Sequence, residues 1–248
     1  MSDFVYAAEL KKTFRCYGHF YRLHIDATDP LLCRSVLEIT SLPREAVGAG
    51  SDPDDLFSTP NENISLPDAV VIMMNPGSSR PIEEGDTESL LTMPLPADFK
   101  KPLVLTQPDN TQYQLMRVMA SKNWKHIRIL NISDLRDPKS PSFIARTKAL
   151  DGLQGGEAHS LFSKVRKNER EKMLQRKPGA PFILGWGQDS GLIPLASQCL
   201  SCIQGERIVT VPSATNPILT AHPSPMMQDK KEEWLETILD ELNKTNGL

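Results

Sequence analysis

Four polar residues follow apolar runs of this sequence, and their side chains are of types that could carry out chemistry together. They are Asn75 in "VVIMMNPGSSRP", Asn131 and Asp134 in "HIRILNISDL", and His222 in "TAHPSPMM". A carboxamide can orient water or read a base edge, a carboxylate can take a proton, and a neutral imidazole can donate a hydrogen bond. Any one of them taken alone is more typical of a turn, a cap or a satisfied core group than of a reactive site. Their meaning depends on whether the fold brings them together.

The hydrophobic pattern alternates between buried strands and amphipathic helices. Strands are predicted at 68–74, 126–132, 181–187 and 207–211, and helices at 109–124, 142–177, 190–203 and 229–243. Asn110 is the expected N-cap of the first of these helices. The alternation predicts an α/β fold, a three-layer α/β/α sandwich with a mainly parallel central sheet. Ligands of such sheets bind at the carboxyl ends of the strands, where the four polar residues would lie.

The N-terminal part of the chain has a different pattern. Two β-prone runs, "FYRLHID" and "CRSVLEIT", predict a hairpin within residues 14–40. The stretch 45–68 holds six acidic residues among prolines, serines and apolar residues, and it is predicted to be mainly a surface loop of no derivable role. We therefore divide the chain into residues 1–67, a hairpin and acidic loop packing on the core, and residues 68–248, the α/β domain. Together they are expected to form one compact domain.

The composition is that of a soluble globular protein. Of 248 residues, 39% are hydrophobic and 24% are charged, and no apolar stretch reaches the roughly 20 residues of a membrane span. The N-terminal residues are a poor signal peptide, so a cytoplasmic, monomeric protein without membrane contact is expected.

The cysteines raise the question of a metal. Cys199 and Cys202 have metal-ligand spacing, but they lie in an apolar, helix-like run without a neighbouring histidine or glycine. Buried thiols are the favoured interpretation for these two and for Cys16 and Cys33, with a zinc or iron–sulfur site as the alternative. No metal and no cofactor is predicted.

Charge is unevenly distributed along the chain. The net charge is −3, which argues weakly against nucleic-acid binding. The segment from Lys164 to Lys177, however, contains seven basic residues and only two acidic ones. Such a basic segment could steer a polyanion, although a solvated helix face is the commoner explanation.

Taken together and in order, four motifs resemble the uracil-DNA glycosylase superfamily. "MNPGSS" resembles the first motif of the mismatch-specific and thymine-DNA branch. "ILNISDL", "ILGWGQDSG" and "TAHPSPMM" resemble the base-reading strand, the "LWG" strand and the "HPSPLS" loop of the uracil-specific branch. The resemblance spans residues 70 to 227. The Met-Asn-Pro turn is equally similar to an uncharacterised bacterial domain family thought to share this fold.

The resemblance implies a monofunctional DNA base glycosylase that flips a uracil or a modified pyrimidine out of the stack and leaves an abasic site. Asn131 would read the base edge, His222 would donate to the departing base, and Asn75 would position water, with Asp134 as reserve base. Met74 and Tyr113 are further base-binding candidates. The candidates for DNA contact, single- or double-stranded, are Gly77, Ser78, Ser79, Ser224, Met226, Lys164, Arg166 and Lys167, with Met226 in the place of the family's apolar wedge.

One departure from the family pattern bears on the substrate. The mismatch branch stacks an aromatic residue on the base, where this chain has Gln112, so Tyr113 or Phe99 would have to substitute. Otherwise the pocket suits a bulkier modified pyrimidine. The same site residues would serve a role in DNA repair or a role in defence against modified DNA. The alternatives are a non-catalytic nucleic-acid or nucleotide-binding module and a hydrolase of small nucleosides.

Overall fold

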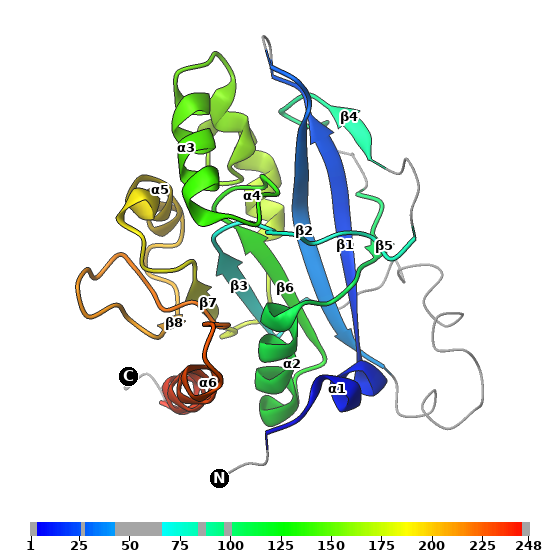
Figure 1. Ribbon diagram of the computed structural model, residues 1–248, viewed down its shortest axis with the longest axis vertical. Helices are drawn as coiled ribbons and strands as arrows, with labels where there is room; N and C mark the ends of the chain where they lie inside the picture. The colour runs from blue at the N-terminus through cyan, green and yellow to red at the C-terminus, as the bar shows by residue number, and fades with distance from the viewer. Residues whose placement is uncertain (1–3, 26–27, 43–65, 84–87, 97–100, 245–248) are drawn as a thin grey trace.

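The computed structural model describes residues 4–25, 28–42, 66–83, 88–96 and 101–244, which form one eight-stranded mixed sheet (Figure 1). The strand order is β4-β1-β2-β6-β3-β7-β8, and β5 pairs with β1. The strands are β1 (Phe14–Leu23), β2 (Leu31–Ser41), β3 (Ala69–Met73), β4 (Ser89–Leu91), β5 (Val104–Leu105), β6 (His126–Asn131), β7 (Phe182–Gly185) and β8 (Ile208–Thr210). Phe99 and most of the acidic loop lie outside the described residues.

Six α-helices accompany the sheet in the described part of the chain. They are α1 (Ala7–Thr13), α2 (Asn110–Lys122), α3 (Ser140–Asp151), α4 (Lys167–Met173), α5 (Ile193–Cys202) and α6 (Gln228–Asn243). The protein therefore belongs to the α/β class, with a mostly parallel sheet. Within the described ranges, no helix is both long enough and apolar enough to cross a membrane.

Four parallel strands, in the order β6-β3-β7-β8, make up the half of the sheet that carries the site. All five residues of β3 are buried, as expected for a central strand covered on both faces. The chain leaves β3 for β6 on one side and later returns to β7 on the other side. This reversal makes a topological switch point at the carboxyl end of β3, the place where open α/β sheets bind ligands.

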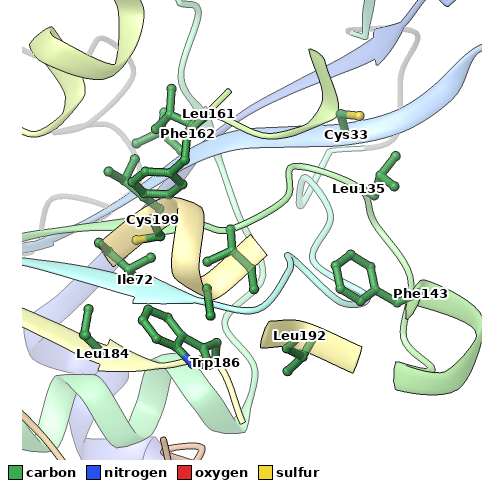
Figure 2. Close-up of a cluster of buried hydrophobic side chains, with 14 of the residues drawn as sticks. Cys33, Ile72, Leu135, Phe143, Leu161, Phe162, Leu184, Trp186, Leu192 and Cys199 are labelled. Atoms are coloured by element: carbon green, nitrogen blue, oxygen red, sulfur yellow. The ribbon is translucent and has the colours of Figure 1, made fainter. Parts of the chain in front are cut away.

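Alternate residues of a strand point to opposite sides of the sheet. Both faces therefore carry apolar side chains, and helices cover both. Val70 and Ile72 pack in one core cluster with residues of α3 and α5, and Val71 and Met73 pack in the other with residues of α1, α2 and α6. Figure 2 shows the first cluster, with Cys199 of α5 close to Ile72. A fully buried aliphatic side chain contributes about 1.5–3 kcal/mol.

The predicted hairpin is present and continues the central sheet. β1 and β2 are antiparallel, and β2 pairs antiparallel with β6 through Leu37 opposite Ile129. The boundary drawn at residue 67 thus separates segments of one continuous sheet.

A β-bulge interrupts this hairpin. His19 pairs with Val36 while Phe20 pairs with Arg34, so that Ser35 is an extra residue in β2. A bulge shifts the alternation of side chains by one. It places Arg34 on the same face as Leu37, where strict alternation would place it on the opposite face.

Two predicted helix features are wrong in detail. Asp109, not Asn110, caps α2, because its carboxylate accepts the Thr111 and Gln112 backbone N–H groups in a capping box. The predicted helix 142–177 is broken after α3. Gly155 adopts a positive φ of 76°, and a Cβ at Gly156 would lie 1.8 Å from the Leu150 carbonyl oxygen, so the chain turns sharply there. Short 3-10 helices lead from this turn to α4.

Candidate functional site

A cavity of about 530 Å³ lies at the carboxyl ends of β3, β6 and β7. Three of the four residues singled out first, Asn75, Asn131 and His222, line it together although they are distant in the sequence. Its volume falls within the ~300–1,000 Å³ typical of small-ligand sites. The exposed residues Ser78 and Gln188 are also in the wall, so the cavity opens to solvent.

Asn131 is the last residue of β6 and has no solvent exposure. Neither its amide nitrogen nor its amide oxygen has a hydrogen-bond partner. Leaving a buried polar group unpaired costs about 1–3 kcal/mol, so such groups are rare without a functional reason. The side chain carries a donor and an acceptor side by side in the cavity wall.

Asn75 is fixed by the turn that follows β3. Its side-chain nitrogen donates to the Asp137 carbonyl at 2.7 Å. The turn itself needs Gly77, whose φ of 60° disfavours other residues, and the Ser79 backbone N–H closes it on the Pro76 carbonyl. The amide oxygen of Asn75 and its second N–H group can hold a water molecule or a ligand.

His222 is held in one tautomer. Its Nδ1 accepts the Ser224 backbone N–H at 3.1 Å, so the proton of the neutral ring sits on Nε2. Burial lowers the pKa of His222 below the usual value of a histidine. At neutral pH the residue is therefore an uncharged N–H donor in the cavity wall, as its predicted role requires.

Arg34 is a cavity residue that sequence reasoning missed. It is 1% exposed, and its Nε and Nη1 atoms have no hydrogen-bond partner. Burial lowers its pKa to about 10, which still leaves it charged at neutral pH. A signal was present in the run "CRSVLEIT", where an arginine stands between a cysteine and a serine of a β-prone segment. The alternation rule aims it at the wrong face because it cannot foresee the bulge.

The aromatic residue in the cavity wall is not the one that the sequence predicted. Tyr113 is 8% exposed, packs in the core cluster shared with α6, and is not part of the cavity wall. Trp186, just after β7, lines the cavity, and its indole N–H donates to the Ile218 carbonyl at 3.0 Å. Gln112 lines it too, although its side-chain oxygen serves the α2 capping box. The prediction that Tyr113 stacks on the base is therefore withdrawn.

Asp134 does not reach the cavity, and its proposed role as reserve base is corrected. It has no solvent exposure, and its Oδ2 accepts from the Tyr21 hydroxyl at 2.8 Å and the Arg166 guanidinium at 2.7 Å. Although it follows Asn131 by only three residues, its side chain is buried in the protein interior and is not part of the cavity wall. A carboxylate engaged by a buried guanidinium and a hydroxyl has no water to activate.

Arg166 is likewise not a DNA contact. It is 1% exposed, and besides Asp134 it binds Glu169 through two hydrogen bonds of 2.7 and 2.8 Å. Other basic side chains of the 164–177 segment are also engaged, since Arg170 donates to backbone carbonyls and Arg176 binds Glu206. The segment is mostly a structural element.

The remaining DNA-binding candidates divide by exposure. Lys164 and Lys167 are exposed but lie outside the cavity wall, and Lys167 is 3.8 Å from Glu171. Ser79 is 3% exposed, too buried for a phosphate contact. Gly77 and Ser78 line the cavity, as does the base-binding candidate Met74. Ser224 is half-buried beside His222, and Met226 is 99% exposed.

Comparison with protein-family models, with curated proteins and with solved structures gave no match to this chain. The cavity and its chemistry are therefore the basis for a functional proposal.

Proposed function

We propose that the protein is a DNA base glycosylase that hydrolyses the N-glycosidic bond of a flipped-out uracil or modified pyrimidine. The observation that carries the proposal is Asn131, a fully buried amide with both polar atoms unpaired in the wall of a ligand-sized cavity. The Watson–Crick edge of a pyrimidine offers donors and acceptors side by side, which an amide can complement. A base seated there would satisfy atoms that the protein leaves unsatisfied.

The other two residues fit the demands of glycosidic cleavage. The bond breaks to a cation-like sugar and an anionic base, so the largest gain comes from a donor preorganised toward the base oxygens. His222, neutral and protonated on Nε2, is such a donor. Asn75, with its nitrogen tied to the Asp137 carbonyl, is suited to orient the attacking water through its oxygen.

The cavity carboxylates fit an orienting mechanism better than a deprotonating one. Asp109 accepts backbone N–H groups at the start of α2, Asp137 accepts from Lys139 and Ser142, and Asp189 accepts from Gly191. Each is engaged as a local cap. Because the sugar cation is already electrophilic, a positioned water molecule needs no strong base.

The surroundings of the cavity are compatible with DNA. Met226 projects fully exposed from the segment that carries His222, where it would fill the gap left by the flipped base. Ser78 at the cavity mouth is placed for a phosphate or sugar contact. A sheet whose parallel strands end at the site, with helices on both faces, supports the three-layer fold of the uracil-DNA glycosylase type as part of the proposal.

An oligonucleotide panel tests the proposal. Single- and double-stranded substrates carrying uracil, thymine mismatches or modified cytosines are incubated with the protein and then treated with alkali, which cleaves at abasic sites. We expect cleavage of at least one substrate, lost in Asn131→Leu and retained in Asn168→Ala, a control at an exposed asparagine of α4. No cleavage of any substrate contradicts the proposal.

The alternative is a module of the same fold that binds nucleic acid or nucleotides without hydrolysis. The capping contacts of Asp109, Asp137 and Asp189 favour it, because each of these carboxylates already accepts hydrogen bonds from its own turn or helix. Asn131-dependent binding of the same oligonucleotides without cleavage would support this alternative.

A further inference from the structure

Arg34 stands in the cavity wall without the partners that a buried charge normally has. At 1% exposure, its Nε and Nη1 atoms have no hydrogen-bond partner among the described residues. Buried charges in proteins are normally paired or neutralised. The contacts of Arg34 with the described residues therefore give no structural reason for a charged side chain at this position.

The backbone is shaped to bring this side chain to the cavity. Ser35 forms the bulge that turns Arg34 toward the face of the sheet on which Ile129 and Asn131 also lie. Bulges that re-aim a side chain are found next to active sites. Arg34 and Asn131 come from the adjacent strands β2 and β6, both line the cavity, and both have unpaired polar atoms.

The acidic groups in the wall do not neutralise Arg34. Of the charged groups, Asp109 has the largest effect on the pKa of Arg34, which it raises. Its carboxylate nevertheless caps α2, and no ion pair between the two is formed within the described residues. Asp137 is engaged by Lys139 and Ser142, and Asp189 by Gly191. The unpaired guanidinium atoms remain for a ligand.

We propose that Arg34 is a specificity-determining residue that binds an acceptor oxygen of the base in the cavity, either a ring oxo group or a carboxylate substituent. The inference rests on the proposed function, and it narrows the substrate class. A guanidinium has only donors and cannot accept from an exocyclic amine. A base that turns an amino group toward Arg34 is disfavoured, and one that turns an oxygen toward it is favoured.

The test uses free bases, so it does not depend on glycosidic cleavage. Uracil, 5-carboxyuracil and cytosine are titrated calorimetrically into the full-length protein and into Arg34→Met, Arg34→Lys and the control Arg207→Met, an arginine outside the cavity. We expect the unmodified protein to bind 5-carboxyuracil and uracil more tightly than cytosine. Arg34→Met should weaken the first two by about 10- to 100-fold, the range of a charged hydrogen bond, and leave cytosine nearly unchanged.

Thermal unfolding separates a ligand-binding arginine from a structural one. Removing an unpaired buried charge should leave the melting temperature of Arg34→Met unchanged or higher, whereas loss of a structural arginine would lower it. Arg34→Lys keeps the charge without the planar fork and should retain part of the preference for 5-carboxyuracil. It also keeps the test valid if Arg34→Met fails to fold.

The outcomes distinguish this inference from the proposed function. Equal affinities of the unmodified protein and both Arg34 variants, or no binding of any of the three bases, overturn the role of Arg34 even if oligonucleotides are cleaved. Arg34-dependent binding of the oxo bases without cleavage of any oligonucleotide supports the role and contradicts the glycosylase.

Discussion

Two regions of the molecule hold buried polar side chains and treat them in different ways. In one, Asp134 and Arg166 are buried and form a chain of ion pairs with the partly buried Glu169 and Lys101. In the other, the cavity at the ends of β3, β6 and β7, Arg34 and Asn131 are buried and have unpaired atoms. The paired region has the features of a structural network, and the unpaired region has those of a binding site.

The comparison shows why burial and charge alone do not identify a functional residue. Asp134 and Asn131 are three residues apart and both are fully buried. Asp134 accepts from a guanidinium and a phenol hydroxyl through Oδ2, although its Oδ1 is unpaired, whereas neither polar atom of the Asn131 side chain has a partner among the described residues. What distinguishes them is that the protein engages the charge of Asp134 and leaves both polar atoms of Asn131 unpaired.

The largest expected effect comes from breaking the paired region. Asp134→Ala leaves the buried Arg166 with Glu169 as its carboxylate partner, so we expect a loss of about 3 kcal/mol in the free energy of unfolding. Urea denaturation measures it. Glu171→Ala, which removes an exposed pair with Lys167, is the control and should change stability by less than about 0.5 kcal/mol. A similar small effect for Asp134→Ala would show that the network is not structural.

The next effect concerns the cavity alone. His222→Ala removes the proposed donor to the departing base and should lower kcat by about 100- to 1,000-fold on the cleaved oligonucleotide. Stability should change little, because the hydrogen bond of the ring within the described residues is to a single backbone N–H, that of Ser224. Single-turnover kinetics and urea denaturation measure the two quantities. A loss of kcat below about tenfold would contradict the role of His222.

Acid pH should weaken the paired region. Burial lowers the pKa of His19 to about 3 and that of His159 to about 4, and both lie beside members of the network. Each is neutral in the folded protein and binds a proton more readily when unfolded, so stability falls as pH drops below about 6.5. The expected slope is at most about 1.4 kcal/mol per pH unit per histidine. His159→Gln should reduce this slope, as measured by urea denaturation from pH 7 to pH 5.

The smallest effect on stability is expected at the unpaired amide. Asn131→Leu replaces unsatisfied polar atoms by an apolar side chain of similar size, so the free energy of unfolding should stay within about 1 kcal/mol or rise. Cleavage and base binding should nevertheless be lost. Thermal unfolding together with the oligonucleotide panel checks both. A loss of stability comparable to that of Asp134→Ala would place Asn131 among the structural residues.

Several elements could be predicted from the sequence because their signals are local. The buried strand at Ala69–Met73 and the helix over Gln228–Asn243 follow from hydrophobic periodicity, which depends only on neighbouring residues. Asn75, Asn131 and His222 could be placed at one rim because parallel strands end on the same side.

Other features could not be predicted because they depend on pairing between distant segments. The bond between Asp134 and Arg166 joins residues that are 32 apart, and no local pattern distinguishes it from a solvent-exposed basic helix. The exclusion of Tyr113 from the cavity depends on how α2 packs against its neighbours.

The amino-acid sequence by itself determined the α/β class, the strand ends and the polar residue types carried there, since each follows from short-range periodicity and side-chain chemistry. Only the tertiary structure decided which of those residues meet in a cavity and which are neutralised in the core. The reason is that hydrogen-bond satisfaction is a property of three-dimensional neighbours, and a single extra residue at Ser35 is enough to turn Arg34 from one face of the sheet to the other.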